Sequence, residues 1–88
     1  MLEIIYTTRF KRDAKRMKKQ GKDMRKLAIL IRRLVDQEAL ARHYRDHALV
    51  GNYSHHRECH IEPDWLLIYR LLTNTLRLER TGSHSDLF

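Results

Sequence analysis

The chain has 88 residues, which is enough for one domain with a small hydrophobic core. It carries 18 Lys and Arg against 11 Asp and Glu, and the net charge of +7 favours an acidic partner such as nucleic acid. No segment approaches the roughly 18 apolar residues of a membrane span, so we expect no membrane partner and a cytoplasmic location. The single cysteine, Cys59, excludes an internal disulfide and agrees with a reducing compartment.

The first third of the chain predicts a strand followed by two helices. The run from Leu2 to Tyr6 is rich in β-branched and aromatic residues and suits a strand. A first helix then has apolar positions at helical spacing: Phe10, Ala14 and Met17. A second helix has a longer apolar stripe: Leu27, Leu30, Ile31, Leu34 and Val35. Thr7 or Thr8 offers a cap for the first helix, Gly21 ends it, and Asp23 caps the second, which predicts a helical hairpin packed on a sheet.

The positive charge is concentrated in this helical hairpin. Residues 9–33 contain twelve Lys or Arg against two Asp, whereas the rest of the chain contains six against nine acidic residues. Such a surface attracts polyphosphate. The candidate RNA-binding residues on it are Lys11, Lys15, Lys18, Lys19 and Arg25. The alternatives are an acidic protein partner, or a solvated helix surface that only keeps the protein soluble.

Between Val35 and Arg57 the sequence shows no convincing periodicity. A connection of this length is unusual in a small domain and more often carries function than idle chain. All six histidines of the protein follow the basic helices, and four of them fall in this connection: His43, His47, His55 and His56. Histidine transfers protons near neutral pH, so a cluster with an arginine and a carboxylate suits acid–base chemistry on a phosphodiester.

A metal site is the rival interpretation of the histidines, because His55, His56, Cys59 and His60 are close in sequence. If Cys59 and His60 belong to one strand, however, their side chains point to opposite faces and cannot both reach one ion. We therefore expect Cys59 to pack in the core, and we expect neither a metal nor another cofactor.

The last third predicts a three-stranded antiparallel meander. The run Trp65–Leu72 is apolar apart from Arg70, which is typical of a central strand covered on both faces. Pro63 and Asp64 form a turn that joins it to the preceding strand Arg57–Glu62, and Thr73 with Asn74 forms a turn into the strand Thr75–Thr81.

In this last strand Arg80 falls on the same parity as Leu76 and Leu78. A guanidinium cannot lie unpaired in a core, so either a bulge shifts the register or Arg80 lies beyond the core, where it reaches a polar cleft. We favour the second arrangement, because a loop at residues 82–84 would bring His84 next to the strand end. An Arg80 paired with a structural carboxylate, Glu79 or Asp86, is the third possibility.

Three segments together carry a family resemblance: DHALVG at residues 46–51, RECHIEPDWLLIYRL at 57–71, and LRLERTGSHSDLF at 76–88. With the basic helical hairpin, they resemble the YafQ branch of the RelE/ParE toxin superfamily over essentially the whole chain. The resemblance implies a single RelE-like α+β domain over residues 1–88. It also implies a toxin of a type II toxin–antitoxin system that cleaves messenger RNA in the ribosomal A site.

The resemblance also implies site residues and partners. The positions that match the family's active site are His47, His60, Asp64, Trp65, Arg80, His84 and Phe88. The implied partners are a DinJ-like DNA-binding antitoxin and the ribosome, with its 16S rRNA and messenger RNA. Ala48 stands where relatives have proline, and residues 53–56 differ from the usual pattern, which affects the conformation of this loop and the codon preference.

The chemistry of RNA cleavage assigns a role to each of these residues. RNA supplies its own nucleophile, the 2′-hydroxyl, so the protein needs a base, a cation for the phosphorane and an acid for the 5′-oxygen. We assign the phosphorane to Arg80, the leaving-group proton to His84, and the base with its orientation to His60, His47 and Asp64. Trp65 or Phe88 can stack on a base, although Trp65 fits the core equally well. The alternatives are a ParE-like toxin that inhibits DNA gyrase, or a DNA-binding repressor complex with no activity of its own.

Overall fold

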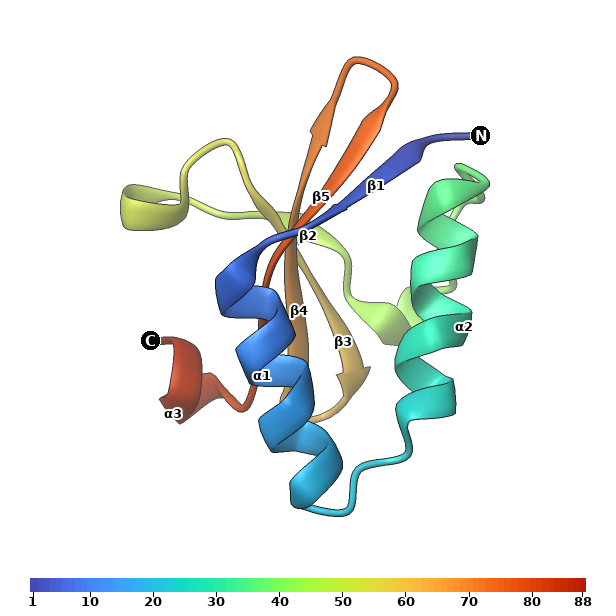
Figure 1. The fold of residues 1–88 in the computed structure, drawn as a ribbon. Helices are drawn as coiled ribbons and strands as arrows, with labels where there is room; N and C mark the ends of the chain where they lie inside the picture. Colours follow the sequence, from blue (N-terminus) through green and yellow to red (C-terminus); the bar gives the residue numbers. More distant parts are fainter.

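Five strands form one curved sheet in the computed structural model, which describes residues 1–88 (Figure 1). Their bounds are β1 (Glu3–Tyr6), β2 (His47–Ala48), β3 (Arg57–Glu62), β4 (Trp65–Leu72) and β5 (Thr75–Gly82). The order across the sheet is β1-β5-β4-β3-β2, with β1 parallel to β5 and every other pair antiparallel. The predicted meander is therefore confirmed, and β4 is the central strand. The chain contains no helix that is long and apolar enough to span a membrane.

The two predicted helices are α1 (Thr8–Lys19) and α2 (Met24–Val35). The Thr7 side chain caps α1 by accepting a hydrogen bond from the backbone of Phe10 at 3.0 Å, and Asp23 caps α2 in the same way. Gly21, at φ +84°, reverses the chain after α1, because a left-handed conformation costs glycine little. The caps predicted at Thr7, Gly21 and Asp23 are thus confirmed.

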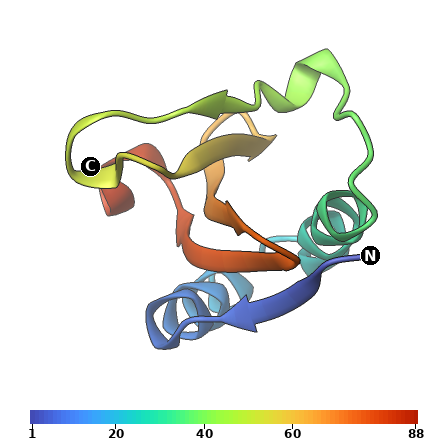
Figure 2. The ribbon, with the colours of Figure 1, turned by 90° about the horizontal axis from the view of Figure 1, so that it is seen from above.

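Both helices pack on the same face of the sheet (Figure 2). Twelve buried side chains form the core between them: Phe10, Met17, Leu27, Leu30, Leu34, Val35, Cys59, Trp65, Leu67, Tyr69, Leu76 and Leu78. The two predicted helical stripes supply half of these residues, and alternate positions of β3, β4 and β5 supply the rest. Cys59 is fully buried here, as expected, and burial raises the pKa of its thiol.

The opposite face of the sheet is covered by the loop around residues 49–56 and by α3 (His84–Leu87) (Figure 2). Its apolar cluster contains only Leu66, Ile68 and Leu87, with Leu49 and Tyr53 packed against it. Trp65 through Tyr69 are all at most 1% exposed, so the centre of β4 is covered on both faces as predicted. The far end of the strand is less covered, since Leu71 is 51% exposed.

Some local structure was not predicted. The connection between α2 and β3 contains the two-residue strand β2 and two short 3₁₀ turns, Arg42–Tyr44 and Gly51–Tyr53. The end of the chain forms α3 rather than an irregular tail. These elements are too short to produce a sequence periodicity, and β2 exists only because β3 pairs with it.

The preferred arrangement for Arg80 is wrong, because β5 contains the bulge that was the first of the two alternatives. Tyr69 of β4 lies opposite Leu78, whereas Ile68 lies opposite Arg80, so Glu79 is the extra residue. The bulge moves Arg80 from the helix-facing side of the sheet to the opposite face. Its carboxylate partner is Asp13 of α1, which is neither of the two carboxylates we considered.

Trp65 is a core residue, which excludes its predicted role in stacking on RNA in this conformation. Its side chain is fully buried on the helix-facing side of β4. The indole Nε1 donates a hydrogen bond at 3.0 Å to the hydroxyl of Thr81, and that hydroxyl donates to the carbonyl of Leu66 at 2.7 Å. A base cannot reach a ring that is sealed in this way.

Candidate functional site

A row of paired residues crosses four strands on the face of the sheet away from α1 and α2. His47 of β2 lies opposite Glu58 of β3, Glu58 opposite Ile68 of β4, and Ile68 opposite Arg80 of β5. Directly paired residues point to the same face of a sheet. The register therefore places the predicted His47 and Arg80 on one surface, with the buried Ile68 as the floor between them.

At one end of the row, His47 and His60 lie on either side of Glu58, with their ring centroids 6.4 Å apart. The Glu58 carboxylate is 3.2 Å from Nε2 of His60 and 3.5 Å from Nε2 of His47. Glu58 is only 5% exposed, and each ring would form an ion pair with it when protonated at Nε2.

Backbone carbonyls bind the other nitrogen of each ring. Nδ1 of His47 donates to the carbonyl of Arg45 at 2.7 Å, and Nδ1 of His60 donates to the carbonyl of Pro63 at 3.3 Å. These bonds fix the proton on Nδ1 and leave Nε2 of each ring as the basic atom. A proton on either Nε2 faces the Glu58 carboxylate directly, so the ring and the carboxylate can share it.

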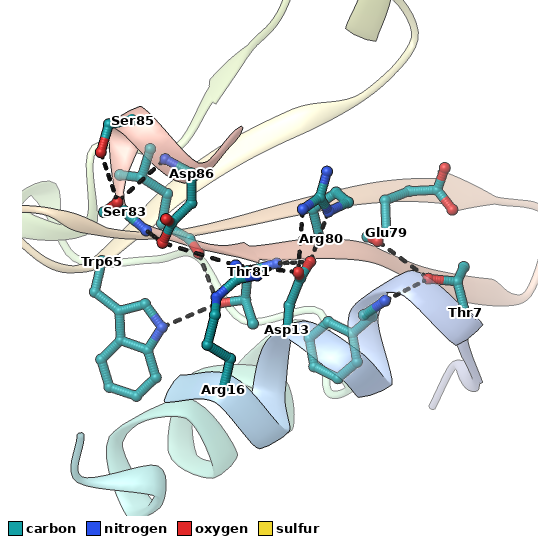
Figure 3. Close-up of polar contacts among 12 residues, drawn as sticks. Thr7, Asp13, Arg16, Trp65, Glu79, Arg80, Thr81, Ser83, Ser85 and Asp86 are labelled. Carbon is teal, nitrogen blue, oxygen red and sulfur yellow. Dashed lines mark hydrogen bonds and ion pairs between the residues drawn. The ribbon is translucent and has the colours of Figure 1, made fainter. Parts of the chain in front are cut away.

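At the other end of the row, the guanidinium of Arg80 is held by Asp13. Its Nε and Nη2 donate to the two carboxylate oxygens at 2.6 and 3.1 Å (Figure 3). The pKa of Arg80 is raised, first by these hydrogen bonds and against the effect of burial, with a smaller contribution from the nearby Tyr53. Arg80 therefore remains a cation throughout the physiological range.

His84 is brought to the site by the turn at the end of β5. Asp64, in the turn between β3 and β4, accepts a hydrogen bond from the backbone N–H of His84 at 2.9 Å. Ser83 and Asp86 form a reciprocal capping box that starts α3. Gly82 permits this close turn, because a Cβ at this position would lie 3.0 Å from the Asp86 carboxylate. Asp64 thus positions the backbone of His84, whereas we had assigned it to orienting the base.

Phe88, the last residue, stacks on His84 with a centroid distance of 4.9 Å and is 55% exposed. Tyr53 meets the Phe88 ring edge-on at 5.6 Å. Next to them is a hollow of about 520 Å³, lined by Arg9, Val50, Asn52, Tyr53, Leu87 and Phe88. The partly exposed Phe88 is therefore available for stacking, unlike Trp65.

The remaining histidines are not part of this row. His56 binds Glu79 at 2.9 Å, the ring of His43 lies tilted against that of Tyr44, and His55 is exposed. Burial opposes ionisation of Glu79, but hydrogen bonds from Arg77 and His56 outweigh it and lower the pKa of Glu79. Cys59 and His60 point to opposite faces of β3, as the parity argument required. No three His, Cys, Asp or Glu side chains lie close enough together to hold a metal ion.

The predicted basic residues lie outside the row, on the exposed surfaces of α1 and α2: Lys11, Lys15, Lys18, Lys19 and Arg25. Four of them form no ion pair within the chain, whereas Arg25 binds the capping residue Asp23 at 3.1 Å. Charge on this surface is therefore available to a polyanion without first breaking internal contacts, except at Arg25.

Three residues of the site were missed. Glu58 has the same strand parity as His60, so it could have been predicted to lie on the same face. Asp13 falls on the apolar stripe of α1 between Phe10 and Met17, so it could have been predicted to be a buried charge that needs a partner. Tyr53 carried none, because its contact with Phe88 depends on a loop that has no periodicity.

Comparisons with known proteins all identify relatives from one family of bacterial toxins. A family profile described as "Bacterial toxin of type II toxin-antitoxin system, YafQ" matches residues 2–88. The mRNA interferase toxin YafQ of Escherichia coli K12 is 42% identical over 87 residues, which cover 98% of this chain and 95% of the relative.

Solved structures also match over the full length. The YafQ chain in the crystal structure of the E. coli DinJ–YafQ complex is 42% identical, with a TM-score of 0.92 and coverage of 100% of this chain and 99% of that one. A copper-bound mutant toxin from Helicobacter pylori is 39% identical, with a TM-score of 0.95 and full coverage of both chains. The predicted fold class and resemblance are thus confirmed, and the chain belongs to the YafQ family of bacterial type II toxin–antitoxin toxins.

Proposed function

We propose that this protein is a toxin that cleaves messenger RNA, acting on the ribosomal A site and silenced by a DinJ-like antitoxin. The observation that carries the proposal is the row His47–Glu58–Ile68–Arg80, which has proton acceptors at one end and a fixed cation at the other. β3 and β5 are separated by β4 alone, so Glu58 and Arg80 are about 10 Å apart at the backbone, and His47 lies one strand farther away. Long side chains can approach one phosphodiester from both ends. The names of the relatives support the same activity.

In the proposed reaction, Nε2 of His60 or His47 takes the proton of the 2′-hydroxyl, and Glu58 stabilises the imidazolium that forms. The 2′-oxygen attacks phosphorus, and the free N–H groups of Arg80 bind the oxygens of the phosphorane. His84 then protonates the 5′-oxygen as its bond to phosphorus breaks. The ring of His84 makes no hydrogen bond within the chain, which leaves it free for this role.

RNA binding involves two surfaces in this proposal. One base stacks on Phe88 and enters the hollow next to Tyr53, because every base offers a flat face to an aromatic ring. The exposed lysines of α1 bind ribosomal RNA as counterions. Raising the salt concentration should therefore weaken ribosome binding more than it slows cleavage of bound message.

The test uses purified protein, translating ribosomes and a defined message, with the new ends mapped by primer extension. Arg80→Ala and His84→Gln should each reduce cleavage by about 10²–10⁴-fold. The matched controls are Arg42→Ala and His43→Gln, which change exposed residues of the same types outside the site. Full cleavage by both site variants would overturn the assignment.

The chemical nature of the products provides a second test. Attack by the 2′-hydroxyl gives a 2′,3′-cyclic phosphate and a 5′-hydroxyl, and needs no metal. A 5′-phosphate end would instead indicate metal-assisted hydrolysis. Inhibition of DNA supercoiling without any cut message would favour a gyrase inhibitor.

A further inference from the structure

Asp13 is a nearly buried carboxylate, 3% exposed, on the side of α1 that packs against β5. Figure 3 shows its side chain directed from the helix to the strand, where Arg80 and Thr81 meet it. It accepts both hydrogen bonds from Arg80, one from the backbone N–H of Thr81 at 3.2 Å, and one from Nη2 of Arg16 at 3.2 Å. Every polar neighbour of this carboxylate is thus a donor.

Stability alone does not account for a charge at this position. Asp13 lies between Phe10 and Met17 on a stripe where an apolar side chain would join the core. Burying a carboxylate has a large desolvation cost, and replacing a buried ion pair by apolar residues is often neutral or stabilising. The arrangement therefore indicates that Asp13 contributes to the function of Arg80.

The geometry of the guanidinium indicates that role. Arginine has five N–H donors in one plane, and Asp13 occupies the edge formed by Nε and Nη2. Nη1 donates no hydrogen bond within the chain and is not a buried atom lacking a partner. The end formed by Nη1 and the second proton of Nη2 therefore has no carboxylate partner, with Tyr53 near the guanidinium, and it matches two oxygens of a phosphate.

We propose that Asp13 is the positioning residue of Arg80: it fixes the rotation of the guanidinium so that the free end faces the scissile phosphate. Asp13 itself does not contact RNA. This proposal rests on the proposed function, in which Arg80 binds the phosphorane. It also assigns α1 a second task beyond its basic outer surface, since the inner surface of the same helix orients the site.

A double-mutant cycle tests the proposal, with kcat and KM measured on translating ribosomes for Asp13→Asn, Arg80→Ala and the double variant. Asparagine keeps the shape but places an amide NH2 among donors, so Arg80 loses part of its anchor. We expect kcat to fall about 10- to 100-fold with KM changed less than about twofold. We expect no further fall when Asp13→Asn is added to Arg80→Ala, because Asp13 then has nothing to position.

Arg16→Gln is the matched control, because it removes a different donor from the same carboxylate and leaves both bonds to Arg80 in place. Its kcat should stay within about threefold of the unaltered protein. The positioning role would be overturned if Asp13→Asn lowered kcat by the same factor in the Arg80→Ala background, or if it changed only KM. Unchanged cleavage by Arg80→Ala would instead overturn the proposed function.

A second measurement needs no variant and applies even if Asp13→Asn does not fold. The Nε proton of Arg80 should exchange with solvent at least about tenfold more slowly than that of the exposed Arg12, because Asp13 holds it. The Nε proton should remain protected from exchange when an uncleavable 2′-deoxy dinucleotide binds, while the NMR signals of the Nη protons shift. Exchange at the rate of Arg12 would contradict the proposal.

Discussion

The two faces of the sheet use the same strands under different constraints. The helix-facing side is closed by twelve buried residues, whereas the opposite side has a buried apolar cluster of three. The polar row of the candidate site lies on this less covered face. Folding free energy is therefore concentrated on one face, which leaves the other free to keep charged and partly exposed groups.

Strand β4 illustrates the division within a single element. Trp65, Leu67 and Tyr69 point to the helices, while Leu66 and Ile68 form the floor of the site. Substitutions on the helix-facing side should therefore lower the free energy of unfolding, whereas substitutions on the opposite face should lower the cleavage activity.

The largest effect should come from Trp65→Ala on the helix-facing side. Removing this ring leaves a cavity and a Thr81 hydroxyl with one partner fewer, which should lower the free energy of unfolding by about 3–5 kcal/mol. Urea denaturation followed by circular dichroism measures the change. Val50→Ala is the control, since Val50 is 87% exposed. Equal stability of the two variants would contradict the division between the faces.

On the opposite face, Glu58→Gln should slow cleavage by about 10- to 100-fold, because the two imidazoles lose the charge that stabilises their protonated form. The fold should remain intact, since an amide is easier to bury than a carboxylate. Single-turnover cleavage of bound message gives the rate, and Glu38→Gln provides an exposed control. A rate equal to that of the control would show that Glu58 takes no part.

The last two residues should sharpen the comparison, because they are adjacent but differ in burial. Phe88→Ala should weaken RNA binding by about 1–3 kcal/mol. It should leave the free energy of unfolding almost unchanged, because the ring is half exposed. Leu87→Ala should instead destabilise the fold, because Leu87 is 6% exposed and anchors α3. Fluorescence anisotropy with a labelled oligonucleotide measures the first effect and urea denaturation the second. The reverse pattern would contradict the assignment of the two side chains.

The smallest effect concerns Glu62, which joins the β3–β4 turn to Lys26 at 2.9 Å and to Lys22 at 3.3 Å. Hydrogen bonds from Lys26 and then Lys22 lower its pKa below the usual value. A lowered folded-state pKa stabilises the protein above the unfolded pKa of about 4.3, and this contribution is lost as pH falls through the folded value.

Glu62→Gln should therefore cost less than about 1 kcal/mol at neutral pH, because both ion pairs are partly exposed to solvent. The difference from the unaltered protein should disappear as pH falls from about 5 through the lowered pKa of Glu62. Urea midpoints measured across this range provide the test. A difference that stays constant with pH would exclude the ion pairs as its source.

Local patterns predicted most of the fold. The apolar stripe of α2, the cap at Asp23 and the turn at Asn74, which has φ +62°, all depend on residues within a few positions of each other. Such features are readable because the helical and strand periods are set by the backbone itself. The long connection was harder, since β2 exists only through its pairing with β3.

The candidate site was predictable in its members but not in its arrangement. His47, His60 and Arg80 lie on one face of the sheet and His84 follows the end of β5, whereas Trp65 lies in the core. Strand parity alone could not place Trp65, because both faces of a central strand are buried. Asp64 was assigned to orienting the base, and the contact that the structure shows for it is with a backbone N–H twenty residues away.

The amino-acid sequence by itself determined the helical and strand periods, the concentration of basic charge on the helical hairpin, and the set of imidazole, carboxylate and guanidinium groups available for chemistry. Only the tertiary structure decided which of those groups meet. A single bulge at Glu79 reversed the face of Arg80, and the carboxylate that holds it is 67 positions earlier in the chain. Periodicity is a property of neighbouring residues, whereas the pairing of a buried charge depends on the long-range packing of a helix against a strand.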